Sequence, residues 1–353
     1  MTTPRFTHEG LAIRVVFGAE SRYGLGAELD ALGLSQVVLV ASASSRAAAD
    51  ELVAVLEHRV TWRVDGVRQH VPAELVDQTE ADASRVGADG VVTIGGGSAT
   101  GLGKAVARSG LPLVAVPTTY AGSEMTPVWG TTRGGSKQVG RDRRVLPRTV
   151  VYDPELTFTL PPDTSAASGM NAVAHCVEAL WSPGASPLSG PLAIDAARSM
   201  CEALPNVVAD PANAGARGRA LVAACQAGMA LATAGAGLHH RLCHVLGGRY
   251  DLPHAHTHAA LLPHVVAFNE PVLGPLAPRI AVAVGAGRGS TGLYDLCVRL
   301  GLPPALSELG MPGPAVDQVA AEVAAYPPPN PRPVDEAGLR SLLGAAWAGD
   351  CPV

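Results

Sequence analysis

The feature that most constrains this chain of 353 residues is a change of pattern after about residue 158. Before that point, short β-branched segments alternate with amphipathic stretches long enough to form helices. We expect strands at six segments: Arg14–Phe17, Val37–Val40, Val60–Val64, Gly90–Ile94, Leu113–Val116 and Thr149–Tyr152. Strands that alternate with helices at this spacing are typical of a parallel sheet with right-handed crossovers. Residues 1–158 are therefore predicted to form a Rossmann-like α/β domain that binds a dinucleotide.

The second part of the chain, residues 159–353, is rich in Ala and Leu at helical spacing and contains few β-branched runs. It is predicted to form an all-α domain that carries the catalytic and substrate-binding groups. The proline-rich segment 326–333 cannot be helical, because each proline lacks a backbone donor and restricts the residue before it. We expect a last helix from Asp335 to Trp347 beyond this break.

The composition excludes several classes of protein. Apolar residues make up 47% of the chain and charged residues 16%, which indicates a packed globule and not a disordered chain. The net charge of −5 argues against a partner such as nucleic acid or an anionic membrane surface. The uncharged stretch 220–238 is close in length to a membrane span, but its glycines and polar residues favour a buried helix. Six cysteines without a C-x-x-C pair, and no secretory pattern at the N-terminus, favour the cytoplasm.

A glycine-rich segment follows the predicted strand Gly90–Ile94. Gly95, Gly96, Gly97 and Ser98 lead directly into a helical pattern. Glycines allow consecutive backbone N–H groups to approach an anion, and a helix N-terminus adds the positive end of its dipole. Ser98 could cap the helix or bond a phosphate oxygen. The segment is predicted to bind a diphosphate, and a tight turn without a ligand is the alternative.

A second polar loop follows the next predicted strand. Thr118 and Thr119 belong to the segment VPTTYAGSE at residues 116–124. Carboxyl ends of neighbouring parallel strands meet at one edge of a sheet, so these hydroxyls are suited to ribose and phosphate contacts. Hydroxyls that bond their own backbone are the alternative. No carboxylate follows the second strand before Asp50, so an acid that would exclude NADPH is not evident.

Histidines are concentrated in the second part of the chain. Seven of the eleven lie between residues 239 and 264, and His175 is an eighth in the same domain. Asn171 and His175 are four residues apart, as are His240 and His244, so each pair shares a helix face. His254 opens a further helical stretch. Imidazoles that converge in this way indicate metal binding or proton transfer.

Residue chemistry favours proton transfer. A divalent cation held by histidines usually takes at least one anionic ligand, but the residue that faces His175 is the neutral Asn171. We therefore predict that no metal is required and that the histidines supply protons and hydrogen bonds. Four further histidines are expected to be core or surface residues, namely His8, His58, His70 and His264.

Seven motifs spread over the chain carry a resemblance to a known family. They are GGGSATGLGKA at 95–105, PTTYAGSEMTPVWG at 117–130, KQVGRD at 137–142, GMNAVAHCVEAL at 169–180, LHHRLCHVLGG at 238–248, LPHAHTH at 252–258 and NPRP at 330–333. Together they resemble the maleylacetate reductases, a branch of the iron-containing alcohol dehydrogenase family. The resemblance implies the dehydroquinate synthase-like architecture of that family and a homodimer.

The resemblance also implies an activity, the reduction of the C=C bond of maleylacetate by NADH or NADPH to give 3-oxoadipate in the breakdown of aromatic compounds. It implies coenzyme diphosphate contacts for Gly95, Gly96, Gly97 and Ser98. It implies nicotinamide or ribose contacts for Thr118, Thr119, Lys137 and Leu156. The family's metal ligands are matched by Asn171, His175, His240 and His254, which makes this a degenerate metal site, and His244 matches a histidine beside the substrate.

The chemistry of such a reduction assigns tasks to the remaining groups. Hydride arriving β to the ketone leaves negative charge on the ketone oxygen, which His244, His240 or His254 could stabilise before a proton is delivered. The dicarboxylate substrate needs cationic partners, for which Arg241 and Lys137 are available, although both could equally be solvated surface residues.

Two other functions are compatible with the sequence. One is a metal-dependent alcohol dehydrogenase that acts on a small aldehyde and accepts the amide as a ligand. The other is a nucleotide-binding protein without catalysis. A lyase of the dehydroquinate synthase type is disfavoured, because it would need the metal-binding acid that Asn171 replaces.

Overall fold

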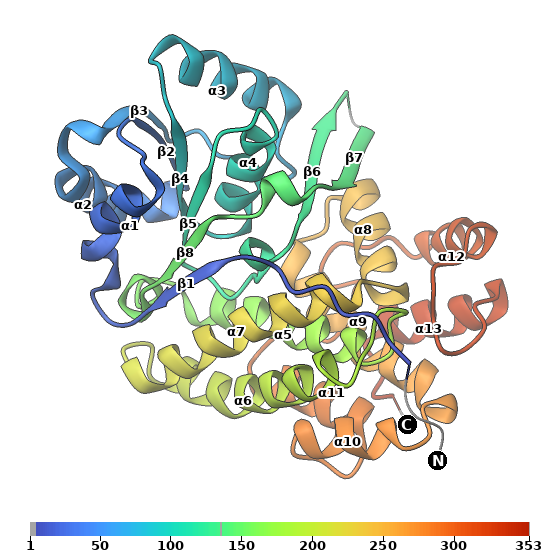
Figure 1. The fold of residues 1–353 in the computed structure, drawn as a ribbon. Helices are drawn as coiled ribbons and strands as arrows, with labels where there is room; N and C mark the ends of the chain where they lie inside the picture. Colours follow the sequence, from blue (N-terminus) through green and yellow to red (C-terminus); the bar gives the residue numbers. More distant parts are fainter. Residues whose placement is uncertain (1–4, 135, 353) are drawn as a thin grey trace. The chain divides into compact units, whose positions relative to one another are not determined.

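The computed structural model describes residues 5–134 and 136–352, which form two compact units (Figure 1). One unit is Leu11–Leu160, and the other is Pro161–Val353 with the described residues before Leu11 grouped with it. The division at residues 160 and 161 lies two residues beyond the boundary expected from the sequence. The predicted fold class is confirmed, because an α/β unit is followed by a helical one.

The first unit is built on a parallel six-stranded sheet in the order β1-β8-β5-β4-β2-β3. Its strands are β1 (Arg14–Phe17), β2 (Val37–Ala41), β3 (Val60–Val64), β4 (Gly90–Gly95), β5 (Leu113–Pro117) and β8 (Thr149–Tyr152). All six predicted strands are present, and each begins at the expected residue. The strand β4 lies between β5 and β2, so the segments that follow these three strands meet at one edge of the sheet.

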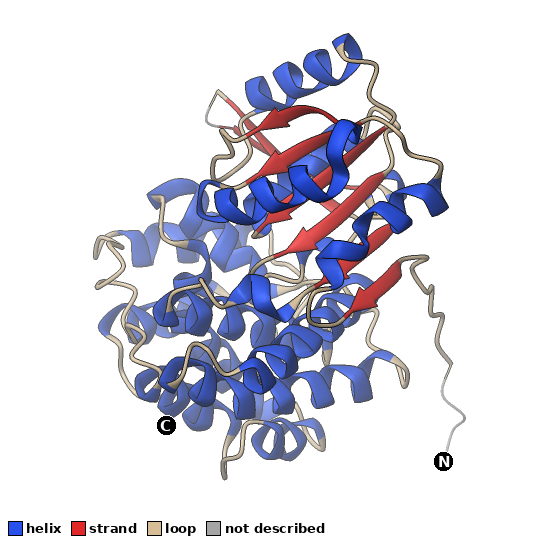
Figure 2. Ribbon diagram, turned by 90° about the vertical axis from the view of Figure 1, so that its left-hand side faces the viewer, coloured by secondary structure: helices blue, strands red, loops and turns tan. Residues whose placement is uncertain are grey.

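Helices cover both faces of this sheet, as Figure 2 shows. Val37 and Leu39 of β2 pack with α1 (Leu25–Leu32) and α2 (Arg46–Leu56) on one face. The intervening residues of β2 pack on the other face with α3 (Ala73–Arg85) and α4 (Gly97–Ala107). Because strand side chains alternate between faces, the continuous apolar runs in the sequence reflect a sheet buried on both sides.

A hairpin in the first unit was not predicted. It consists of β6 (Val128–Arg133) and β7 (Ser136–Arg141), which pair in antiparallel register. Its sequence is short and rich in glycine, which hides the alternation typical of strands. A tertiary contact supports it, because the Arg108 guanidinium at the end of α4 lies 3.8 Å from the centre of the Trp129 ring.

The second unit is helical throughout its described part. Its helices are α5 (Pro162–Ala179), α6 (Ser189–Ala209), α7 (Ala214–Ala234), α8 (Leu238–Tyr250), α9 (His254–Asn269), α10 (Leu276–Ala283), α11 (Gly289–Arg299), α12 (Ala315–Ala325) and α13 (Glu336–Ala348). The proline-rich break separates α12 from α13 as expected. One core cluster joins α8, α9, α12 and α13.

The uncharged stretch 220–238 divides between two helices. It covers most of α7, whose small residues are largely buried, and ends at the first residue of α8. Within residues 5–134 and 136–352, no single helix is long and apolar enough to cross a membrane. The helices α7 and α8 meet that criterion only when taken together, and they are bent by 103° relative to each other.

Candidate active site

The glycine turn joins β4 to α4 in the first unit. Gly95 has a φ of 146°, which L side chains rarely adopt, and a Cβ there would lie 2.7 Å from Ser42 Oγ. Gly96 is the N-cap of α4, where a Cβ would lie 2.9 Å from Thr119 Cγ2. Gly97 follows as the exposed first residue of the helix. The helix N-terminus is therefore not covered by side chains of the turn itself, as an anion site requires.

Ser98 lies inside the first turn of α4 and is half-buried. It is not the helix cap, because Gly96 occupies that position. The prediction that Ser98 could cap the helix is thus wrong, and its bond to a phosphate oxygen stays a prediction.

The loop after β5 lies against the glycine turn. The Thr118 backbone N–H donates to the Gly95 carbonyl at 3.0 Å, and Thr119 borders Gly96. The Thr118 hydroxyl lies 3.3 Å from Ser45 Oγ, in the segment that follows β2. The structure therefore brings together polar groups from the ends of β2, β4 and β5.

Two other predicted coenzyme contacts come from further elements of this unit. Leu156 belongs to the short 3₁₀ helix Pro154–Thr157 and packs in the core with Val116 and Val151. Lys137 lies in β7, and its side chain is outside the part of the chain that the structure describes.

A buried lysine on α4, the helix that follows the glycine turn, was not predicted. Lys104 of α4 is fully buried, and its Nζ donates to the Ser123 carbonyl at 2.8 Å and to Thr126 Oγ1 at 3.0 Å. The neighbouring Glu124 is also buried and accepts a 2.6 Å hydrogen bond from the Tyr152 hydroxyl. Burial lowers the pKa of Lys104 to about 7, against the attraction of Glu124, and burial raises the pKa of Glu124. This network fastens the loop after β5 to α4.

The predicted histidine cluster forms in the second unit, from α5, α8 and α9. The rings of His175 on α5 and His240 on α8 are stacked with centroids 5.1 Å apart. His244, one turn further along α8, lies 6.3 Å from His240 and 6.3 Å from His254 at the start of α9. Asn171 lies one turn before His175 on α5, so all five predicted residues come from these three helices.

The cluster is graded from buried to exposed. Asn171, His175 and His240 are buried, with exposed fractions of 4%, 6% and 6%, whereas His244 is half-buried and His254 is exposed. Burial lowers the pKa of His175 well below its usual range, so this imidazole is neutral. Among the described residues, Asn171 Oδ1, His175 Nδ1 and His240 Nε2 have no hydrogen-bond partner. Buried polar atoms of this kind are available to a ligand or to water.

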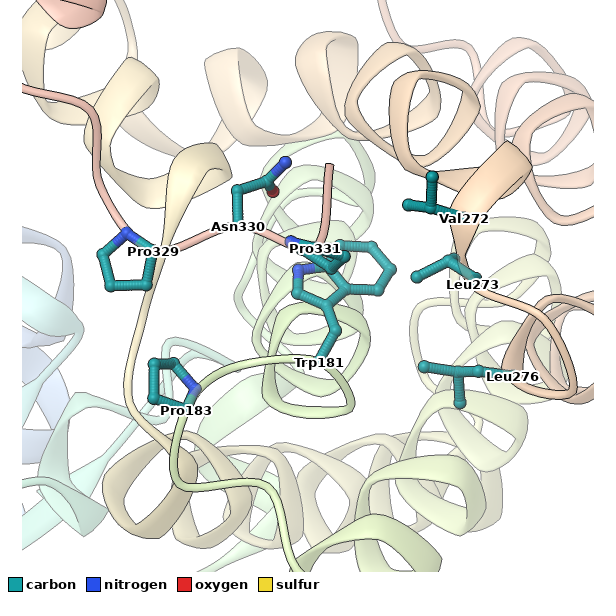
Figure 3. Close-up of a pocket in the computed structure, with 8 residues that line it drawn as sticks. All are labelled: Trp181, Pro183, Val272, Leu273, Leu276, Pro329, Asn330 and Pro331. Carbon is teal, nitrogen blue, oxygen red and sulfur yellow. The ribbon is translucent and has the colours of Figure 1, made fainter. Parts of the chain in front are cut away.

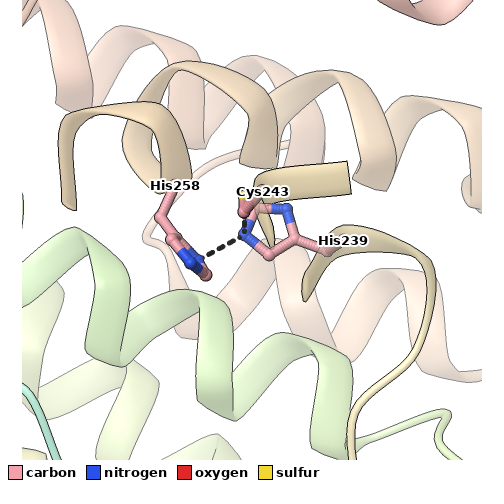
Figure 4. A group of neighbouring side chains, drawn as sticks. All are labelled: His239, Cys243 and His258. Carbon is pink, nitrogen blue, oxygen red and sulfur yellow. Dashed lines mark hydrogen bonds between the residues drawn. The ribbon is translucent and has the colours of Figure 1, made fainter. Parts of the chain in front are cut away.

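Three further buried residues support the cluster (Figure 4). His239 Nε2 and His258 Nδ1 are 2.9 Å apart, and Cys243 Sγ lies 3.7 Å from His239 Nε2. The ring of His258 is 4.5 Å from that of His254 and 5.0 Å from that of His240. The ligand atoms of the three residues fall within 4.8 Å of one another, but burial lowers the pKa of His239 to about 3 and raises that of Cys243 well above its usual range. The trio is therefore a neutral, hydrogen-bonded support.

A carboxylate that contacts His240 was also not predicted from the sequence. Glu178, in the last turn of α5, is fully buried and accepts a hydrogen bond from His240 Nδ1. Burial alone would raise the pKa of Glu178, but the adjacent His240 and further hydrogen bonds lower it to about 2. No spacing rule would have linked Glu178 to His240, because the two residues are 62 positions apart.

The structure also locates Arg241 and two histidines that were expected to lie outside the site. Arg241 lies 3.8 Å from Glu322 of α12, which also pairs with Arg249 at 3.0 Å, so it matches the surface alternative. His58 is exposed and His264 is buried within α9, as expected for residues outside the site.

Known proteins match this chain over nearly its whole length. The model of the iron-containing alcohol dehydrogenase family matches residues 12–154, and its C-terminal model matches residues 165–347. A maleylacetate reductase of Burkholderia cepacia is 44% identical over 98% of this chain and 99% of its own length. One of Sphingobium indicum is 43% identical over 99% of both chains. The crystal structure of maleylacetate reductase from Agrobacterium tumefaciens matches with a TM-score of 0.95 at 40% identity, over 99% of this chain and 100% of that one.

The chain belongs to the iron-containing alcohol dehydrogenase family. Within this family it groups with the maleylacetate reductases, and it is an oxidoreductase. The resemblance inferred from the seven sequence motifs is thereby confirmed.

The donor atoms that the resemblance to the family matches to its metal ligands include no carboxylate or thiolate. They are the amide oxygen of Asn171 and the imidazoles of His175, His240 and His254. The nearby carboxylate, Glu178, contacts Nδ1 of His240, whereas the unpartnered nitrogen of this ring is Nε2. Iron and similar ions favour a site with an anionic ligand, so this donor set does not fit the family's metal.

An apolar pocket in the helical unit is separate from the histidine cluster (Figure 3). It is lined by Trp181, Pro183, Val272, Leu273, Leu276, Pro329, Asn330 and Pro331. None of these residues was predicted to take part in the reaction.

Proposed function

We propose that this chain reduces the C=C bond of maleylacetate with NADH or NADPH and produces 3-oxoadipate in the degradation of aromatic compounds. The observation that carries the proposal is identity of 40–44% with maleylacetate reductases over nearly the full length of both chains. The glycine turn and the histidine cluster supply what this reaction requires: an anion site for a dinucleotide and proton-carrying side chains.

In the proposed reaction, the coenzyme diphosphate lies at Gly95, Gly96, Gly97 and Ser98. Thr118, Thr119, Lys137 and Leu156 are assigned to the nicotinamide and ribose. The turn presents backbone N–H groups, which do not distinguish NADH from NADPH. Both coenzymes are therefore candidates.

Hydride adds to the carbon β to the ketone, and the electron pair of the C=C bond moves onto the ketone oxygen as an enolate. A proton then goes to the α carbon, which restores the ketone. His244 is half-buried and His254 is exposed, so these imidazoles are the accessible members of the cluster. They are assigned, with His240, to stabilise the enolate and to supply the proton. His175 and Asn171 line the buried side.

We infer that the reaction does not need a bound metal. Two observations support this. The side chain of Asn171 is a neutral amide, and the nearby carboxylate of Glu178 already accepts hydrogen bonds from His240 Nδ1 and from backbone N–H groups. An uncharged donor set binds iron or zinc less tightly than one that contains a carboxylate.

The test is steady-state kinetics of NADH and NADPH oxidation with maleylacetate, with 3-oxoadipate identified as the product, on protein whose metal content has been measured. Turnover that survives a chelator supports the proposal. Stoichiometric iron or zinc with activity lost on chelation would support the metal-dependent alcohol dehydrogenase instead. Coenzyme binding without turnover on maleylacetate would favour a nucleotide-binding protein.

We further propose a cytoplasmic homodimer. Five of the six cysteines are buried, and none of these five is in a disulfide within the described residues, which suits a reducing compartment. The edge strand β1 exposes Val15 and Phe17 to 43% and 44%, and an apolar edge of this kind can pair with a second copy. Light scattering on the purified protein measures its mass in solution, and a monomer would refute the dimer.

A further inference from the structure

The position of Glu178 is unusual for a carboxylate, because it is fully buried and both of its oxygens are used. Oε1 accepts a hydrogen bond from the His239 backbone N–H at 2.7 Å. Oε2 accepts from the His240 backbone N–H at 3.4 Å and from His240 Nδ1. These N–H groups belong to the first turn of α8, where helical donors have no partner within the helix. A carboxylate from α5 therefore caps α8 and also holds one of its histidines.

Gly237 makes this close approach possible. It is the N-cap of α8, and a Cβ there would lie 2.6 Å from the Pro329 carbonyl oxygen and 3.2 Å from Glu178 Oε1. Pro329 belongs to the proline-rich segment between α12 and α13. Reciprocal amide hydrogen bonds of 3.0 and 2.7 Å between Asn269 and Asn330 hold that segment in place. The start of α8 is thus fixed from two sides.

The contact with Glu178 also decides where His240 carries its hydrogen. An ionised carboxylate only accepts hydrogen bonds, so Nδ1 of His240 must be the donor. Nε2 is then the ring nitrogen without hydrogen, and it is buried and has no hydrogen-bond partner among the described residues. It belongs to the ring that stacks on His175 at 5.1 Å. A carboxylate that bonds one nitrogen of a histidine orients the ring and sets its tautomer.

We propose that Glu178 is a positioning residue of the reductase reaction, which acts through His240 by fixing its ring and presenting Nε2 to the histidine cluster. The inference rests on the proposed function, because the reaction measured is the reduction of maleylacetate. A cap with only a structural role would stabilise α8 without affecting His240, and this difference can be measured.

The main experiment is a double-mutant cycle with Glu178→Gln and His240→Ala. Gln keeps the size of the side chain and one oxygen, but its NH₂ group cannot accept from the imidazole. We expect kcat to fall about 10- to 100-fold in Glu178→Gln, with KM for NADH and maleylacetate within about twofold of the wild type. In the His240→Ala background, adding Glu178→Gln is expected to change kcat by less than about twofold. An equal loss of kcat in both backgrounds would overturn the inference.

Glu270→Gln is the matched control. Glu270 accepts from the Ser290 backbone N–H at 2.9 Å near the start of α11 and pairs with Arg288, so it caps a helix of the same unit without contacting a histidine. We expect it to lower the midpoint of thermal unfolding and to leave kcat unchanged. If Glu270→Gln lowered kcat as much as Glu178→Gln does, a general loss of helix stability would explain both and the inference would fail.

A second measurement detects the tautomer of His240 directly. In NMR spectra of protein labelled with ¹⁵N-histidine, we expect His240 to carry its hydrogen on Nδ1, with assignment by the loss of the signal in His240→Ala. A His240 that carries hydrogen only on Nε2 would overturn the inference. This outcome does not depend on turnover, so failure of the inference can be told apart from failure of the proposed function, which would appear as a wild type inactive on maleylacetate.

Discussion

The glycine turn of the α/β unit and the histidine cluster of the helical unit are built in opposite ways. The turn consists of consecutive backbone groups at Gly95–Ser98, whose geometry follows from the lack of side chains. The cluster consists of side chains from α5, α8 and α9, with up to 83 positions between Asn171 and His254. A backbone site can be recognised from adjacent residues, whereas a side-chain site depends on how separate helices pack.

The two regions also handle buried charge differently. In the α/β unit, burial lowers the pKa of Lys104 and raises that of Glu124, so each is shifted toward its neutral form. In the helical unit, hydrogen bonds and His240 outweigh burial and keep Glu178 ionised. The difference is consistent with the nearby His240, which attracts the ionised form of Glu178 and donates a hydrogen bond to it.

The largest expected effect tests whether the accessible side of the cluster performs the chemistry. His244→Ala is expected to lower kcat/KM for maleylacetate by about 1000-fold, within the range for the loss of a general acid. Steady-state kinetics measure this loss. His256→Ala is the control, since His256 is also half-buried but bonds Asp163 at 3.0 Å, and its kinetics should match the wild type. Unchanged kinetics in His244→Ala would remove this residue from the mechanism.

The next prediction tests whether the glycine turn binds the coenzyme through its backbone. A Cβ on Gly96 would press against Thr119, so Gly96→Ala is expected to weaken NADH binding at least about 10-fold, or about 1.4 kcal/mol. Calorimetric titration gives the Kd. Gly26→Ala in α1 is the control, because a Cβ there has no atom of the described structure within 4 Å. Equal affinity in the two variants would contradict the assignment of the turn.

A third variant tests the neutral character of the cluster. Asn171→Asp adds an anionic ligand beside His175 and is expected to raise the affinity for Zn²⁺ or Fe²⁺ by about 10-fold or more, without an increase in reductase activity. Metal analysis after dialysis and kinetics measure the two effects. Asn206→Asp adds the same charge at an exposed position of α6 and should not bind more metal. Reductase activity that rises with bound metal would show that the metal-free mechanism is wrong.

The last prediction concerns the buried lysine of the α/β unit. The pKa of Lys104 is about 7 in the folded protein, below its ordinary value of 10.5, so between these pH values the unfolded chain binds the additional proton. This contribution to the free energy of unfolding therefore rises with pH by at most about 1.4 kcal/mol per unit. Urea unfolding should show that the wild type gains stability relative to Lys104→Met from pH 7 to pH 9, by no more than about 1.4 kcal/mol for each pH unit. A constant difference would mean that the pKa of Lys104 is not lowered.

Much of the fold could be predicted because its signals are local. The central strands of the parallel sheet are buried throughout, as in the continuous apolar run Val37–Ala41, which requires burial on both faces. The β6–β7 hairpin was missed, because Trp129 is stabilised by Arg108, which is distant in the sequence. Asn171, His175, His240 and His244 were found through spacings of four residues, which a helix brings to one face.

The amino-acid sequence by itself determined that an α/β unit is followed by a helical unit, that a glycine turn follows the strand β4, and that residue 171 is an amide and not an acid. These features depend on residue type and on neighbours within a few positions. Only the tertiary structure decided that Glu178 bonds His240, that Lys104 lies buried beside Glu124 and that Ser98 is not a cap. Such contacts arise when elements far apart in sequence pack together, and burial then sets the protonation of the groups that they bring into contact.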